Sequence, residues 1–174
     1  MQSLRYLYRI LFLLFAEASP ELEVLPVGAP EYAAGYSIDR LRDLALVKLD
    51  SDQARHSTHL YESLDVLFGL VDEGHQNRAP EEHLEEGLTF NSLRADLFLP
   101  KAIGLISEVR LGDEALQRVL RHLLLSKQTK DRDRGFISYA DLGINQLGAV
   151  YEGLMSYTGC LLYTSPSPRD ATLS

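Results

Sequence analysis

The 174-residue chain has no tryptophan and a single cysteine, Cys160. One cysteine excludes an intrachain disulfide scaffold and a four-cysteine zinc site. No apolar run reaches the roughly 18 residues that a membrane-spanning helix needs. Basic residues are also scarce, since 17 lysines and arginines stand against 25 aspartates and glutamates, a formal net charge of −8. A protein that binds nucleic acid non-specifically usually carries the opposite charge.

The rest of the composition fits one folded domain. Hydrophobic residues make up 45% of the chain and charged residues 24%, which provides for a core and excludes global disorder. A length of 174 residues corresponds to a single domain. Because no membrane span and no disulfide framework is present, we expect a cytoplasmic protein without a membrane partner.

The spacing of apolar residues predicts a mainly α-helical fold, with about five helices in one irregular bundle, long connectors and no persistent sheet. The first helix runs from about residue 3 to 18, a shorter second one opens at Ser37, and the third covers residues 60–73. The fourth starts at Asp113, and the fifth carries the apolar residues between 144 and 154. The apolar stripes of the first, third, fourth and fifth helices should form one core.

Several residues predict where these helices begin and end. Ser37 and Asp113 are suitable N-caps for the second and fourth helices. Gly74 should end the third helix. Ser138 and Asp141 have the spacing of a capping box ahead of the fifth helix, with aspartate in place of the usual glutamate.

The first segment has a second interpretation, as a cleaved secretory signal. Arg5 and Arg9 supply a positive start, residues 10–16 (ILFLLFA) form a short apolar core, and Ala16 and Ala18 are spaced as at a cleavage site. However, apolar residues recur at helical spacing throughout the segment, which favours a helix of the folded domain. An N-terminus found at Ser19 would support the signal.

The C-terminal segment, residues 160–174 (CLLYTSPSPRDATLS), differs from the rest of the chain. It has no helical period and is rich in serine and proline. It also resembles a translated sequencing-adapter scar, so we expect a non-native tail that is disordered. The expected domain is therefore residues 1–159, a helical region that is part of a larger protein.

Three stretches resemble one protein family. They are residues 4–18 (LRYLYRILFLLFAEA), residues 63–73 (SLDVLFGLVDE) and residues 135–157 (GFISYADLGINQLGAVYEGLMSY). In this order they resemble the helical region that precedes the catalytic core of large adenine-specific DNA methyltransferases. These enzymes belong to restriction-modification and phage-defence systems, of the type IIG/IIL and phage-growth-limitation types. The first motif corresponds to residues 7–17, and the last and most specific motif to residues 144–155.

The family's catalytic motifs are missing from this chain. The resemblance implies S-adenosylmethionine as cofactor of the parent protein, DNA as its partner and, in fused members, an endonuclease domain. Yet the sequence contains no Pro-Pro pair, no Gly-x-Gly and no Asp followed by Glu-x-Lys. The motif that contacts the flipped target adenine is therefore absent, along with the cofactor loop. No catalytic, cofactor-binding or metal-binding residue is transferred to this chain.

Two groups of residues are candidates for binding. Lys127, Lys130, Arg132 and Arg134 form a dense basic group that suits DNA phosphate contacts, or else belong to an ordinary exposed loop. Asn145, Gln146, Tyr151 and Glu152 are the polar residues of the last motif. They either dock this region onto the methyltransferase core or belong to a conventional capped helix in the bundle.

The histidines offer a weaker signal. His56 and His59 are three residues apart, but a metal site would need at least one more ligand from elsewhere. We expect these histidines to be solvated at the start of the third helix rather than to bind a metal.

Two functions of different classes follow. The chain is expected to be the helical spacer of an adenine-specific DNA methyltransferase, inactive on its own, with apolar surface exposed where its neighbouring domains are missing. Alternatively, it is a self-contained small helical module for protein interaction. A stop codon soon after residue 158 in the native gene would favour the module.

Overall fold

A computed structural model describes residues 1–76, 88–126 and 135–156 of the chain. Within these ranges the fold is mainly helical, and the predicted fold class is confirmed. The helices are α1 (Gln2–Ala18), α2 (Pro30–Gly35), α3 (Arg40–Leu46), α4 (Asp52–His56), α5 (His59–Glu73), α6 (Gly104–Val109), α7 (Asp113–Leu124) and α8 (Ile144–Ser156), with short 3₁₀ turns η1 (Pro20–Leu22) and η2 (Pro100–Ile103). All five expected helices are present as α1, α3, α5, α7 and α8. The short helices α2, α4 and α6 were not expected.

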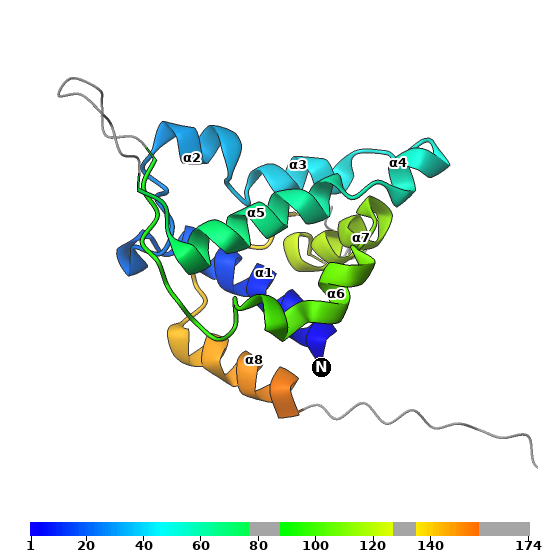
Figure 1. Cartoon of the computed structure of the whole chain (residues 1–174). Coiled ribbons are helices and arrows are strands. Elements are labelled where there is room, and N and C mark those ends of the chain that lie inside the picture. The colour runs from blue at the N-terminus through cyan, green and yellow to red at the C-terminus, as the bar shows by residue number, and fades with distance from the viewer. Residues whose placement is uncertain (77–87, 127–134, 157–174) are drawn as a thin grey trace, which may run out of the picture.

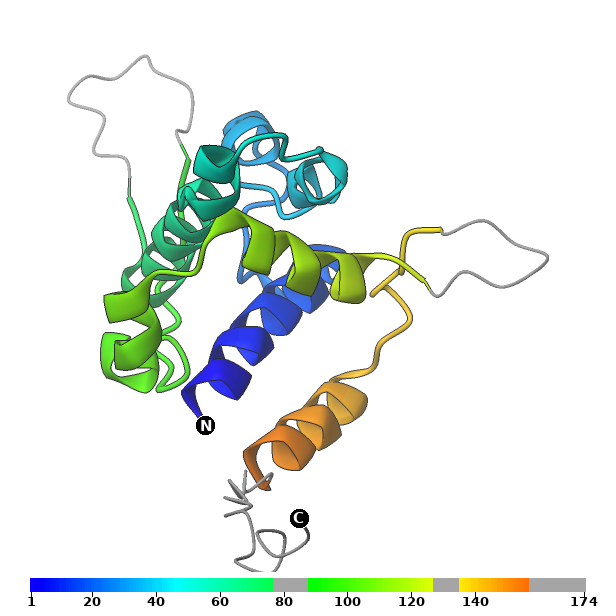
Figure 2. The same ribbon diagram turned by 90° about the vertical axis from the view of Figure 1, so that its right-hand side faces the viewer.

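The helices enclose α1. Figure 2 shows α1 between α8 on one side and the layer that contains α5 and α7 on the other. Helices α3 and α4 both pack against α7, and α6 packs against the start of α1 (Figure 1). Only isolated backbone bridges join extended segments among the described residues, at His75–Phe90 and Leu125–Phe136, so no sheet is formed there.

The main core gathers around one face of α1. Ile10 and Leu13 are fully buried, and they belong to the same cluster as Leu64, Leu116 and Leu120. Tyr6 lies parallel to Tyr61 and edge-on to Phe68, at ring-centroid distances of 6.0 and 5.6 Å. The apolar stripe of residues 4–18 is therefore a core element, as the helical interpretation of this segment predicted.

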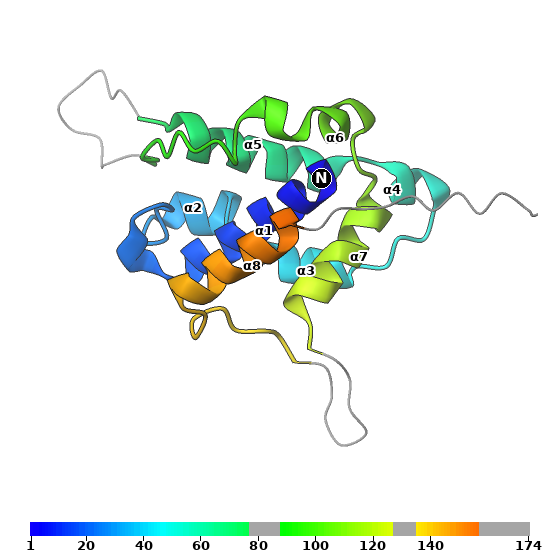
Figure 3. The same cartoon turned by 90° about the horizontal axis from the view of Figure 1, so that it is seen from below.

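Helix α8 lies outside this main core, which corrects the expectation of a single one. It runs antiparallel to α1 (Figures 1 and 3) and contributes to a small cluster of Tyr8, Phe15 and Leu147. Leu147 is the one residue of α8 that is buried. Phe12 and Leu97 pack against both clusters and so connect them.

Helix ends are capped mostly by side chains from other helices. Asp113 was expected to cap its own helix, but α7 follows Gly112 and the Asp113 carboxylate instead accepts hydrogen bonds from the Leu60 N–H of α5 at 2.8 Å and the Ser57 hydroxyl at 2.7 Å. Gln117 of α7 donates to the carbonyl oxygens of Leu44 and Val47, at the C-terminal end of α3. Helix α7 therefore joins the start of α5 to the end of α3, and these bonds satisfy backbone groups that helix ends leave free.

Two further capping predictions are corrected. Helix α3 begins at Arg40 rather than at Ser37, whose Oγ accepts from the Asp39 N–H at 3.1 Å. Helix α8 begins at Ile144, and Ser138 accepts only a long hydrogen bond, 3.4 Å, from the Ala140 N–H. Gly74 does end α5, with a positive φ of 77°, as predicted. The expected tail at residues 160–174 lies outside the described residues.

Candidate docking surface and pocket

Arg9 of the first motif is a buried structural cation. Its side chain is 2% exposed, and it donates from Nε to the Leu97 carbonyl at 2.7 Å and from Nη2 to the Leu99 carbonyl at 2.8 Å. The guanidinium also lies 5.3 Å from the ring centre of Phe68 and 5.6 Å from that of Phe98. Burial lowers the pKa of Arg9, and these contacts compensate the charged form. Arg9 therefore holds residues 97–99 against α1 and α5.

Glu17, the last residue of the same motif, anchors α2 and α3 to α1. Its carboxylate accepts from the Tyr32 hydroxyl at 2.6 Å and the Ser37 hydroxyl at 2.6 Å. It also accepts from the N–H groups of Ile38 at 2.7 Å and Asp39 at 3.1 Å. Burial, followed by the bond to Glu17, raises the pKa of Tyr32. All four interactions hold the chain in place ahead of α3.

Tyr8 connects the first motif to the last. Its hydroxyl donates to the Leu147 carbonyl at 3.3 Å, and its ring centre lies 4.9 Å from that of Tyr151. Burial raises the pKa of Tyr8. Residues 139 positions apart in the chain are thus in direct contact. The first motif, residues 7–17, and the last motif, residues 144–155, therefore pack against each other.

The four candidate docking residues have different environments. Gln146 accepts from the Gly143 N–H at 2.9 Å, so it caps its own helix. Tyr151 packs on Tyr8 and is still 40% exposed. Asn145 and Glu152 are exposed. The structure therefore brings only Tyr151 into contact with α1, and leaves Asn145 and Glu152 on the open surface.

Exposed apolar side chains accompany these residues on α8. Ile144 is 65% exposed and Val150 is 39% exposed. Both belong to the stripe that the sequence assigned to the core, so the periodicity identified them without showing that they lie on the surface. We define the docking surface as Ile144, Asn145, Val150, Tyr151 and Glu152.

The predicted basic group, Lys127, Lys130, Arg132 and Arg134, lies outside the described residues. The segments that flank it are fixed to the bundle. The Ser126 N–H donates to the Gly135 carbonyl and the Ile137 N–H to the Leu124 carbonyl, both below 3 Å. Tyr139 also donates to the Leu123 carbonyl at 2.7 Å.

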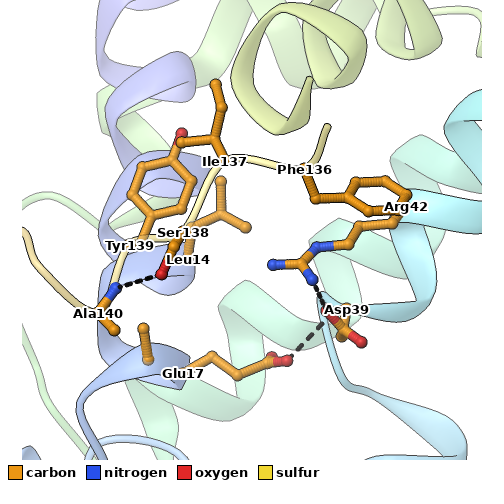
Figure 4. Close-up of a pocket in the computed structure, with 10 residues that line it drawn as sticks. Leu14, Glu17, Asp39, Arg42, Phe136, Ile137, Ser138, Tyr139 and Ala140 are labelled. Carbon is orange, nitrogen blue, oxygen red and sulfur yellow. Dashed lines mark hydrogen bonds and ion pairs between the residues drawn. The ribbon is translucent and has the colours of Figure 1, made fainter. Parts of the chain in front are cut away.

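Beside these segments lies a pocket of about 290 Å³. Three parts of the chain form it: the end of α1, the start of α3 and the extended residues 136–140 (Figure 4). Arg42 pairs with Asp39 at 2.7 Å, and its guanidinium lies 5.1 Å from the ring centre of Phe136. No pattern in the sequence singled out Arg42, because the residues around it come from segments nearly 100 positions apart.

The described histidines are exposed, and His56 hydrogen-bonds through Nδ1 to the Asp52 carbonyl at 2.8 Å. Within the described ranges no three residues of the types His, Cys, Asp and Glu are grouped as metal ligands. None of the described helices is long and apolar enough to cross a membrane.

No protein-family model, curated protein or solved structure matches this chain.

Proposed function

We propose that this chain is the helical spacer of a site-specific adenine DNA methyltransferase, and that α8 is where the catalytic core of the parent protein docks. The observation that carries the proposal is the contact between the two motifs. Residues 7–17 and 144–155 resemble the family most closely, and Tyr8 of the first packs directly on Leu147 and Tyr151 of the second.

The roles of the motif residues support a scaffold rather than an active site. Arg9 donates to two backbone carbonyls and Glu17 accepts from four donors, all within this chain. A buried ion that already has its partners contributes to folding, because removing a partner leaves a charge without compensation. The first motif thus orders α1, against which the last motif packs.

The docking surface supports an interface with more protein. Ile144 exposes an apolar side chain next to the polar Asn145 and Glu152 on one flank of α8, and Val150 exposes another on the opposite flank. Exposed apolar residues that are rimmed by polar ones are typical of protein–protein contacts. Because α8 is the last described element, polypeptide that follows it in the parent protein would start next to this surface.

The cofactor would be held elsewhere in the parent protein. A chain without Gly-x-Gly and without a Pro-Pro turn does not supply the family's site for S-adenosylmethionine, and no chemical step is derived from these residues. In this proposal the parent protein binds DNA in the cytoplasm, methylates adenine in its recognition site and acts in restriction-modification or phage defence.

The test is methyl transfer by the whole native protein. With labelled S-adenosylmethionine and mixed-sequence DNA, the parent protein should label adenine, and residues 1–159 alone should not. Ile144→Asp should reduce transfer by the parent protein while the isolated region stays folded, since Ile144 is 65% exposed. Leu105→Asp is the matched control, because Leu105 is 62% exposed on α6. Equal losses from the two variants would contradict docking through α8.

A self-contained interaction module remains the alternative function. The exposed apolar residues of α8 would then meet a separate protein rather than the parent's own core. This alternative predicts that the native protein has no methyl-transfer activity at all.

A further inference from the structure

The pocket between α1, α3 and residues 136–140 contains an incompletely used cation. Arg42 pairs with Asp39 through Nη1 alone, at 2.7 Å. Its Nε is closed off from solvent and has no hydrogen-bond partner within the described part of the chain. A buried donor without a partner is unfavourable, so an acceptor that reached this edge of the guanidinium would stabilise it.

The guanidinium is held in place rather than free. Its stacking on Phe136 at 5.1 Å and its pairing with Asp39 restrict the side chain, which is 30% exposed. In Figure 4 one terminal nitrogen points into the pocket, toward the segment that carries Ser138, while the other is paired with Asp39. The Ser138 Oγ accepts from the Ala140 N–H, which leaves its hydroxyl proton able to donate.

The shape and lining of the pocket limit the ligand. Its volume, about 290 Å³, is close to the lower end of the 300–1,000 Å³ that is usual for ligand pockets. Leu14, Ile137 and Tyr139 supply apolar walls. The planar Nε–Nη2 edge of an arginine matches a carboxylate, with two parallel hydrogen bonds.

We propose that this pocket binds a carboxylate on a small apolar body, through the unpaired edge of Arg42 and the hydroxyl of Ser138. Because Nε is closed off from solvent, the first contact is with Nη2, and pairing with Nε as well requires a small shift of the side chain. The site is independent of the docking surface on α8.

Two carboxylates that line the pocket, Glu17 and Asp39, repel a bound carboxylate to different degrees. Glu17 already accepts from four donors, which offset its charge. Asp39 competes directly, because it shares the same guanidinium. The ligand should therefore bind weakly to the native chain and more tightly once the charge of Asp39 is removed.

The experiment is a ¹H–¹⁵N NMR titration with sodium benzoate, with neutral benzamide as the matched probe. Benzoate should cause saturable shifts at residues 136–140 that benzamide does not cause. Arg42→Gln should weaken the binding about tenfold or more, since a hydrogen bond to a charged group contributes about 1.5–3 kcal/mol. Arg118→Gln, which changes an exposed arginine of α7, should leave it unchanged.

The direction in which Asp39→Asn changes the affinity for benzoate is the decisive test. Asp39→Asn should strengthen benzoate binding several-fold, and this result stands even where Arg42→Gln fails to fold. Equal shifts from benzamide, unchanged binding in Arg42→Gln, or weaker binding in Asp39→Asn would each overturn the proposal. Titration with the blocked dipeptide acetyl-Leu-Glu-amide separates the two sources of carboxylate. Tighter binding than benzoate identifies an acidic protein segment as the ligand, and weaker binding identifies a free small carboxylate.

Discussion

Replacing Glu17 with alanine should destabilise the fold strongly, although the residue is not in the main core. The substitution removes the acceptor of four hydrogen bonds, from two hydroxyl and two backbone donors. Tyr32 and Ile38 are each 1% exposed, so water cannot readily replace the carboxylate there. Ser37 and Asp39 are more accessible and can be rehydrated.

The magnitude follows from the two buried donors. Each buried donor that loses its partner costs roughly 1–3 kcal/mol, so Glu17→Ala should lower the free energy of unfolding by about 3 kcal/mol. For a chain of this length that loss corresponds to a drop of about 6–12 °C in the melting temperature. Since domains are stable by about 5–15 kcal/mol, the variant should fold but melt early.

The assay is urea unfolding followed by circular dichroism, with Glu73→Ala as the control. Glu73 is an exposed glutamate in the last turn of α5, and its removal should change stability by less than about 0.5 kcal/mol. In a double-mutant cycle, Tyr32→Phe should cost about 1–2 kcal/mol in the native chain and much less in the Glu17→Ala background. Additive effects, or a loss below 1 kcal/mol for Glu17→Ala, would refute the structural role assigned to this motif residue.

Three further predictions concern the tyrosines, the glycines and α8. Burial raises the pKa of Tyr6 above its ordinary value of 10.0, so the unfolded chain loses this proton first and the free energy of unfolding should fall as the pH rises above about 10. Tyr6→Phe should flatten this fall in melting curves from pH 8 to 11.5. At pH 7 the same variant should cost little stability, because the Tyr6 hydroxyl has no hydrogen-bond partner in the described part of the chain. Gly74→Ala should lower the free energy of unfolding by more than about 1 kcal/mol, since the φ of Gly74 is positive and a Cβ would lie 2.9 Å from the Phe90 carbonyl oxygen. Gly69→Ala is the control, because a Cβ at Gly69 would meet no atom within 4 Å, and it should raise the free energy of unfolding by about 1 kcal/mol when both variants are unfolded in urea. Leu147→Ala should speed hydrogen exchange of the α8 amides while leaving those of α5 protected, because Leu147 belongs to the small cluster on α1; equal acceleration in both helices would contradict a separate cluster.

The sequence predicted the long helices because their apolar residues repeat on one face. This local pattern is sufficient for α1, α5 and α7, whose buried residues recur at spacings of three and four. It failed for α2, α4 and α6, which have only five or six residues each. Such short helices depend on tertiary contacts rather than on periodicity.

The N-cap predictions failed for a related reason, whereas the C-terminal prediction at Gly74 was confirmed. Asp113 has the right residue type for an N-cap, but its carboxylate reaches a different helix, α5. A pattern along the chain identifies a side chain that can accept hydrogen bonds and cannot show which donors the fold brings to it. The sequence did not predict the pocket at Arg42 for the same reason, since Phe136 lies far from Arg42 in the chain.

The candidate docking residues show what a motif can and cannot predict. The apolar spacing of the last motif predicted the helix α8, and Tyr151 does contact α1. Its other polar residues were grouped only because they are neighbours in sequence. Gln146 caps the helix, while Asn145 and Glu152 are exposed, so their roles differ in the fold.

The most direct measurement for the proposed function is to read the native gene through codon 158 and several hundred bases beyond. If the chain is the spacer of a methyltransferase, the reading frame should continue into a strand followed by a glycine-rich loop and then an Asn-Pro-Pro-Tyr turn, in place of residues 160–174. A native frame that encodes residues 160–174 as they stand and then stops would contradict it. The helices described here would then form a complete interaction module rather than the spacer of a methyltransferase.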